Sequence, residues 1–191
     1  MIITEVSQND QKEVKETVSL IREIILDPNC RGLNVASIKG LLGELYAKEL
    51  LENEGQQVIH KTRNVGYDLE IYPGIRIDVK LSTIKGTQEY PDWGWTLQRA
   101  AQEELRCTHI MGIGVNKQLE MERIVIIRVQ DIEQFPELAG KYEDVLRSFT
   151  LMLDGFEYPR HPYFQQCREL VDQGVVAVLR PGDELMDYFY E

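Results

Sequence analysis

Apolar residues recur at helical spacing near the start of the chain, at Val14, Val18, Ile21 and Ile25. This spacing predicts an amphipathic helix that begins near residue 7 or 9 and ends before the Asp-Pro pair at residues 27–28. A second helix is predicted from Asn34, which can cap it, to about residue 53, with Gly55 as the stop. Its apolar stripe would consist of Ile38, Leu41, Leu42, Leu45 and Tyr46.

Two later runs, residues 67–72 and 75–80, alternate between apolar and polar positions and are separated by Pro73 and Gly74. This alternation is typical of β-strands and Pro-Gly is a common turn, so we predict a hairpin. Further strands are predicted at residues 57–61, 109–115, 124–129 and 175–179. The near-continuous apolar runs among them suit central strands that are covered on both faces.

The order of these elements predicts an α/β fold with a mixed central sheet flanked by helices. Helical segments are also predicted within residues 93–106, at 142–153 and at 163–173. With 191 residues, of which 43% are hydrophobic, the chain fits one compact domain. We divide it into an N-terminal helix and loop (residues 1–33), a core (34–130) and a C-terminal elaboration (131–191).

The predicted hairpin carries three polar side chains that can meet. Asp78 and Lys80 are two residues apart on one strand, so they project from the same face, and Asp68 lies on the polar side of the other strand. Mg²⁺ prefers one or two carboxylates together with several waters. The sequence therefore indicates a divalent-metal site at this hairpin, with a lysine beside it that can orient a water.

Asp68, Asp78 and Lys80 form the pattern D-x(9)-D-x-K, preceded by a predicted helix that carries Glu44. This arrangement resembles the PD-(D/E)xK nuclease superfamily, which includes the type II restriction endonucleases. The first acid of that pattern often follows a proline, whereas here it follows Tyr67. The resemblance covers roughly residues 35–116.

The resemblance implies a restriction-endonuclease-like fold in which residues 34–130 are the catalytic core. Asp68, Asp78 and the Val79 carbonyl would bind Mg²⁺, for which Mn²⁺ can substitute. Glu44 would ligate a metal or hold its water, and Lys80 would orient the attacking water. The implied function is metal-dependent hydrolysis of double-stranded DNA by a homodimeric type II restriction endonuclease.

Several alternatives remain open at this stage. The enzyme could be a repair or junction-resolving nuclease, or the fold could serve a non-catalytic nucleic-acid-binding or scaffolding protein with Asp78 and Lys80 in a structural salt bridge. Glu49 competes with Glu44 as the helical acid, because a helical wheel places it near the centre of the apolar stripe. Tyr90, Trp93 and Trp95 could stack on bases or belong to the core, and Gln98, expected on a helix, is a weaker candidate for positioning DNA.

The net charge of −11 argues against simple nucleic-acid binding, because contacts to phosphate require lysine and arginine. The charge is unevenly distributed, however, since residues 58–106 carry equal numbers of basic and acidic side chains. Cations bound at Asp68 and Asp78 would leave a local positive surface made by Lys61, Arg63, Arg76, Lys85, Arg99 and Arg106. DNA binding is therefore expected to depend strongly on metal and on low salt.

The remaining chemistry is less informative. Cys30, Cys107 and Cys167 show no paired spacing and are interpreted as buried thiols, and the three histidines, His60, His109 and His161, are interpreted as structural. No apolar run is long enough to span a membrane, and the N-terminus is too polar for a signal peptide. We therefore expect a cytoplasmic protein without membrane contacts.

Overall fold

The computed structural model describes residues 8–30, 35–61, 66–72, 74–86, 91–98, 107–134, 148–152 and 171–190. Its centre is a six-stranded mixed sheet of order β1-β2-β3-β7-β8-β10, in which only β3 and β7 run parallel. The strands are β1 (Val58–His60), β2 (Leu69–Ile71), β3 (Ile75–Thr83), β7 (His109–Val115), β8 (Met121–Arg128) and β10 (Val176–Leu179). The predicted α/β class with a mixed sheet is confirmed.

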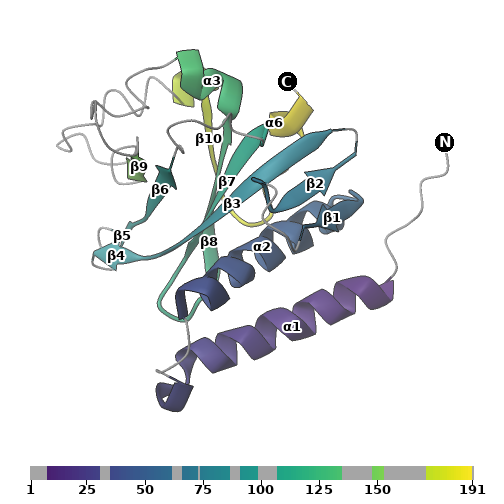
Figure 1. Ribbon diagram of the computed structural model, residues 1–191, viewed down its shortest axis with the longest axis vertical. Helices are drawn as coiled ribbons and strands as arrows, with labels where there is room; N and C mark the ends of the chain where they lie inside the picture. Colours follow the sequence, from purple (N-terminus) through teal and green to yellow (C-terminus); the bar gives the residue numbers. More distant parts are fainter. Residues whose placement is uncertain are drawn as a thin grey trace.

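Two long helices cover one face of this sheet. The helix α2 (Val35–Asn53) packs on β3, and α1 (Gln8–Leu26), followed by the short η1 (Pro28–Cys30), packs on α2 (Figure 1). Both helices agree with the predicted boundaries, and Gly55 ends the second with a positive φ of 79°. Leu41 departs from the predicted apolar stripe, because its side chain remains 38% exposed.

The predicted hairpin is also confirmed. Strands β2 and β3 pair antiparallel, with Leu69 opposite Ile77 and Ile71 opposite Ile75. Gly74 takes a φ of 83°, a conformation that glycine adopts without the steric cost other residues meet. Ile75, Ile77 and Val79 are buried, while Asp78 and Lys80 are only partly covered. The period-two pattern therefore assigns the two faces of β3 correctly.

Two small sheets accompany the main sheet. One pairs β4 (Lys85–Gly86) with β5 (Pro91–Asp92), and the other pairs β6 (Gly94–Gln98) with β9 (Ser148–Met152). The helix predicted within residues 93–106 is therefore wrong over 94–98, and the one predicted at 142–153 is wrong over 148–152. The rest of these two segments, and the helix predicted at 163–173 up to residue 170, lie outside the described residues.

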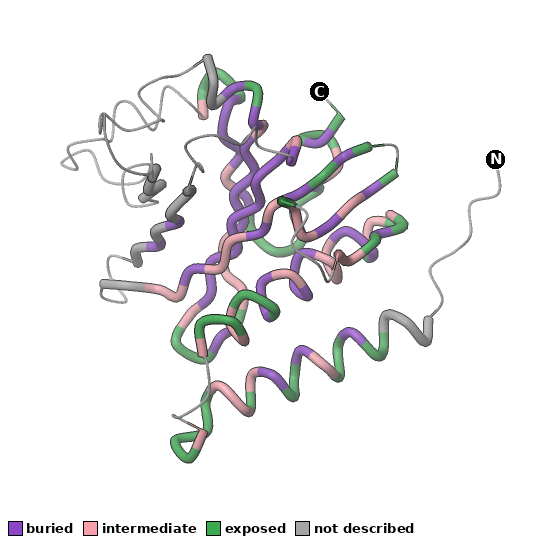
Figure 2. The backbone as a smooth tube through the Cα atoms, viewed as in Figure 1, coloured by how far each residue is buried: buried purple, intermediate pink, exposed green. Residues whose placement is uncertain are grey.

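The two faces of the main sheet carry separate buried clusters. The larger cluster joins side chains of α1 and α2 to one face of the sheet, and the smaller lies on the opposite face, around Trp93, Trp95, Ile110 and Val125. Figure 2 shows the central strands buried along most of their length. Hydrophobic burial on both faces is the main source of stability for such a sheet.

The C-terminal part adds an edge strand to the main sheet and a short helix to the core. After α3 (Val129–Gln134), strand β10 adds to the free edge of β8, as predicted for residues 175–179. The last helix, α6 (Asp187–Tyr190), buries Phe189 against the core. The Glu54 carboxylate accepts hydrogen bonds from the backbone N–H groups of Leu185 and Met186 and so ties this end to α2. Among the described helices, none is both long and apolar enough to cross a membrane.

Candidate functional site

Strand β3 loses its neighbour β2 before Leu69, and we call the place where they part, around Asp68 and Val79, the fork. Strand β2 pairs with β3 only from Leu69 onward, whereas β3 continues to Thr83 on the side that β2 has left. Asp68 stands at the fork, where its backbone N–H still donates to Ile77 O at 2.9 Å. Its side chain replaces the missing strand, because Asp68 Oδ2 accepts a hydrogen bond from the Val79 N–H at 2.7 Å.

The same geometry orients the carbonyl of Val79. In a β-strand the N–H and C=O of one residue point to the same side. The Val79 N–H points to Asp68, so the Val79 carbonyl also points toward the side of β3 that β2 leaves open. The fork therefore brings a carboxylate and a backbone oxygen to one place.

Asp78 and Lys80 lie on the face of β3 opposite α2. Continuing the register of the hairpin, in which Leu69 faces Ile77, places Asp68 across from Asp78. Lys80 Nζ contacts both oxygens of Asp78, at 2.8 Å and 2.7 Å. The two side chains remain 36% and 24% exposed, so water reaches the pair.

The two aspartates share an electrostatic environment that disfavours their ionisation. Burial raises the pKa of the Asp68 carboxyl above its ordinary value, although the Val79 N–H opposes the shift, and the nearby Glu44 carboxylate raises it further. Burial likewise raises the pKa of Asp78, with the Lys80 ammonium opposing the shift and Asp68 adding to it. A pair of partly buried carboxylates with raised pKa values is suited to a bound cation, which would favour the ionised forms.

Glu44 reaches the site from α2. Its neighbour Gly43 lies so close to β3 that an added Cβ would meet Leu81 Cβ at 2.9 Å, so the glycine allows the helix to approach the strand. The Glu44 carboxylate forms a 2.5 Å hydrogen bond with His60 Nε2 of β1, and it acts electrostatically on Asp68. The structure thus brings Glu44, Asp68, Asp78 and Lys80 into one region.

Glu49 lies elsewhere. Its carboxylate is 3.9 Å from Lys15 Nζ of α1, so Glu49 faces the first helix rather than the fork. Of the two helical acids, Glu44 is therefore the one that lies near Asp68.

The residues of the fork match a hard cation that keeps much of its hydration. Asp68, Asp78 and the Val79 carbonyl offer oxygen ligands, which Mg²⁺ prefers together with several waters. Within the described ranges, no group of three or more histidine, cysteine, aspartate or glutamate side chains is arranged to hold a metal. Carboxylate and carbonyl oxygens are the kind of donor that suits Mg²⁺ or Mn²⁺.

Sequence reasoning missed His60 and Cys107 as members of this region. His60 was interpreted as structural, yet it shares with Val58 the face of β1 that turns toward α2, and this alternation was the available signal. Burial, with Asp78 adding to it, raises the pKa of the Cys107 thiol to about 11. Of the other cysteines, Cys30 is only partly buried and Cys167 lies outside the described residues.

The two tryptophans belong to the core. Trp93 is fully buried and Trp95 is 3% exposed, and their indole N–H groups donate to Val115 O and Ile113 O. Their rings lie against Gly114 and Gly112 of β7, where any Cβ would collide. Stacking of these rings on bases is therefore ruled out, while Tyr90 lies outside the described residues. Gln98 lies on strand β6 rather than on a helix.

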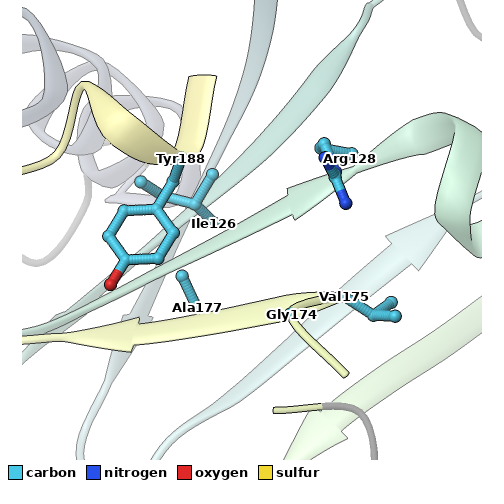
Figure 3. A pocket seen from close by; sticks show the side chains of 6 residues that line it. All are labelled: Ile126, Arg128, Gly174, Val175, Ala177 and Tyr188. Carbon is cyan, nitrogen blue, oxygen red and sulfur yellow. The ribbon is translucent and has the colours of Figure 1, made fainter. Parts of the chain in front are cut away.

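A small hollow lies apart from these carboxylates. It lies between β8, β10 and α6 (Figure 3), where it is lined by Ile126, Arg128, Gly174, Val175, Ala177 and Tyr188. The Arg128 guanidinium is already paired with Asp131 at 2.6 Å. The fork therefore remains the best candidate site among the described residues.

Comparison with known proteins does not identify a family for this chain. No protein-family model matches the chain, and neither does any curated protein. Among solved structures, the chain is similar to a bacterial homing endonuclease, with 12% sequence identity, a TM-score of 0.42, and coverage of 72% of this chain and 93% of that chain. A similarity at this level does not decide what the chain does.

Proposed function

We propose that the protein is a Mg²⁺-dependent endonuclease of the PD-(D/E)xK type that hydrolyses phosphodiester bonds of double-stranded DNA. In this proposal it is a cytoplasmic type II restriction endonuclease, and a homodimer presents one site to each strand. The observation that carries the proposal is the fork, where Asp68, Asp78 and the Val79 carbonyl converge beside Lys80. Fold alone does not determine function, so the proposal rests on these residues.

The proposal assigns a role to each of these side chains. Asp68, Asp78 and the Val79 carbonyl would hold the metal ion, with Glu44 ligating it or holding one of its waters. A bound Mg²⁺ supplies charge stabilisation for the phosphate and lowers the pKa of a coordinated water. Lys80 would orient the attacking water, whose oxygen forms the new bond to phosphorus as the bond to the leaving sugar oxygen breaks. The Lys80 ammonium would also stabilise the negative charge that develops on the phosphate oxygens.

His60 has a supporting role in this scheme. Its short hydrogen bond with Glu44 keeps that carboxylate on the side of α2 that faces the fork. It would act by positioning Glu44, in the way that groups behind a ligand orient the ligand.

The direct test is to incubate the purified protein with plasmid DNA and Mg²⁺, and in parallel with Mn²⁺ or with EDTA. Discrete fragments with metal and none with EDTA would support sequence-specific cleavage, and cleavage confined to branched or damaged duplexes would favour the repair alternative. Absence of cleavage of all these substrates with either metal would contradict the proposed activity.

One observation favours a non-catalytic alternative. The Lys80 ammonium contacts both oxygens of Asp78, as expected if the pair is a structural salt bridge in a nucleic-acid-binding or scaffolding protein. A measurement of metal binding distinguishes the nuclease from the scaffold. In the nuclease a cation must replace part of the contact between Lys80 and Asp78, whereas a scaffolding protein need not bind a cation there.

Metal binding is expected to raise the melting temperature in a pH-dependent way. Because the folded-state pKa values of Asp68 and Asp78 are raised, the stability these groups contribute is present at low pH and is lost as pH rises through those values. A cation binds the ionised forms, so it stabilises most where they are ionised. Mg²⁺ at about ten times its Kd contributes about 1.4 kcal/mol, or a Tm increase of about 3–5 °C near pH 8 for a chain of this size.

Thermal melts with Mg²⁺ or EDTA measure this effect. The increase should shrink as the pH is lowered and the two carboxyls become protonated, and it should be absent in Asp78→Asn. An increase that does not change with pH, or that persists in the variant, would place the bound metal elsewhere.

Glu44→Gln and Glu49→Gln form a matched pair, because each removes one charge from α2 while keeping side-chain volume. Glu44→Gln is expected to lower kcat/KM for plasmid cleavage, or metal affinity, at least about tenfold, which corresponds to about 1.4 kcal/mol. Glu49→Gln loses only a surface contact with Lys15, so its activity should match the wild type. The opposite ranking would assign the helical acid to Glu49, and two unaffected variants would remove this helix from the site.

A further inference from the structure

Several described residues on one face of the wing formed by β1, β2 and β3 are exposed. The helices α1 and α2 lie on the other face (Figure 1). On the exposed face, Ile59 of β1 is 49% exposed and Tyr72, just after β2, is 80% exposed. The register places Ile59 across from Glu70, and Glu70 across from Arg76. This face is continuous with the fork, because Arg76, Asp78 and Lys80 alternate along the same side of β3.

On this face, the ring of Tyr67 lies next to two cationic side chains, Arg76 and Lys61. The Tyr67 ring centroid is 5.7 Å from the Arg76 guanidinium carbon and 5.9 Å from Lys61 Nζ. Lys61 is already paired with Glu70, at 2.8 Å from Nζ to Oε2, and the Tyr67 hydroxyl donates to the same carboxylate at 3.4 Å. Tyr67 itself is partly buried against the second core cluster, which fixes the ring.

Arg76 differs from Lys61 in having an exposed side chain that makes no ion pair among the described residues, although its charge helps to lower the pKa of the Glu70 carboxyl across from it. Its backbone is held firmly, since the Thr108 hydroxyl accepts from the Arg76 N–H at 2.9 Å and donates to Arg76 O at 3.0 Å, and the Thr108 N–H donates to the same oxygen at 2.7 Å. A guanidinium placed on an aromatic ring, on a fixed strand, loses little freedom when it binds an anion.

We infer that Arg76, held on Tyr67, is a phosphate-binding site for the nucleic-acid backbone next to the phosphate that is cut. This inference rests on the proposed function, because the location of the scissile phosphate follows from the metal ligands. Residues two apart on a strand are separated by about 6.6–6.8 Å, so Arg76 lies one such step from Asp78. That separation is on the scale of one nucleotide of a backbone, and a guanidinium can contact a phosphate through two N–H groups.

The test measures binding of a short DNA duplex at several salt concentrations, with Ca²⁺ in place of Mg²⁺ and with the substrate checked to be intact. Each phosphate contact adds about 0.9 to the slope of log Kobs against log salt. Arg76→Gln should lower the slope by about 0.9 and weaken binding on the order of tenfold near 0.1 M salt, for all duplex sequences alike. Arg76→Lys keeps the charge and should retain most of the slope.

Two controls make the result specific. Arg180→Gln removes an exposed arginine at the turn after β10, which is the edge strand opposite β1 in the sheet, and should leave affinity and slope unchanged. Tyr67→Phe keeps the ring and should bind as the wild type does, whereas Tyr67→Leu should weaken binding because Arg76 loses its support. In cleavage assays the Arg76→Gln effect should appear in KM with kcat retained.

The outcomes separate this inference from the proposed function. Wild-type binding without cleavage, together with the expected loss in Arg76→Gln, would support the phosphate site while contradicting the nuclease. Normal cleavage with an unchanged slope in Arg76→Gln would overturn the phosphate site and leave the nuclease standing. Failure of the wild type to bind the duplex with Ca²⁺ would overturn the inference as well.

Discussion

Asp78→Asn is expected to abolish DNA hydrolysis, with kcat/KM at least about a hundredfold lower, a loss of about 2.7 kcal/mol of transition-state stabilisation. The amide keeps the shape of the side chain but removes the charge that a divalent cation needs. Asp78 lies opposite Asp68 in the register of the hairpin, and these two carboxylates are the side-chain ligands that the proposal assigns to the metal. Steady-state cleavage of a plasmid or a defined duplex provides the measurement.

The same substitution is expected to leave the fold intact. Asp78 projects from the polar face of β3, away from the larger core cluster, and its loss relieves the charge repulsion with Asp68 when no metal is bound. In EDTA near pH 8 the Tm of the variant should therefore equal or exceed that of the wild type. Asp172→Asn, at an exposed position outside the site, is the matched control. Cleavage by Asp78→Asn at near wild-type rates would refute the assignment of the site.

Lys80→Ala is expected to lose most of its turnover while still binding metal. Protonated lysine has no lone pair for a cation, and its ammonium competes with the metal for both oxygens of Asp78. Removing that positive charge should leave the affinity for Mn²⁺ equal to or tighter than that of the wild type, measured by calorimetry, while kcat falls by about a hundredfold or more, comparable to losses from removing a group that stabilises the transition state.

Lys80→Arg separates charge from shape. A planar guanidinium cannot place a water as a compact ammonium does, so this variant should also fail in turnover. Lys12→Ala removes an exposed lysine of α1 that pairs only with Glu16 at the surface, and it should be neutral in both assays. If Lys80→Ala lost metal affinity together with activity, Lys80 would be a structural partner of Asp78, as in the non-catalytic alternative.

Both predictions concern one short hairpin, whose strands and faces can largely be predicted from the sequence. Alternation with period two places Asp78 and Lys80 on one face and Ile77 and Val79 on the other, because neighbouring side chains of a strand must point to opposite sides. The turn at Gly74 is followed by the antiparallel pairing of the two strands. Local geometry was therefore enough to nominate Asp68, Asp78 and Lys80.

The helices and central strands could also be predicted from the sequence, because their patterns depend on neighbours along the chain. The boundaries of α1 and α2 follow from apolar spacing and from Pro28 and Gly55, and the apolar run at residues 109–115 corresponds to β7. In each of these elements the local preference and the tertiary environment agree, which is the condition under which sequence patterns are reliable.

Only the tertiary structure decided the remaining points. The segment at residues 148–152 became strand β9 because it pairs with β6, a partner far away in the sequence, and short apolar runs do not distinguish a helix from a strand. Packing against β7, which follows later in the sequence, buried Trp93 and Trp95 beside Gly114 and Gly112, so these rings were unavailable for stacking.

The positions of Glu44 and Glu49 relative to the fork could also be found only from the packing of the helices and the sheet. A helical wheel places Glu44 toward the edge of the apolar stripe and Glu49 nearer its centre, and only the packing of the elements shows that Glu49 meets Lys15 of α1, while Glu44 meets His60 on β1. The stacking of Arg76 on Tyr67 likewise depends on the side chains of two strands coming together. The sequence by itself determined the period-two chemistry of the hairpin, because that depends on neighbours along the chain. The tertiary structure decided which distant groups surround it, because those contacts depend on how helices and sheets pack.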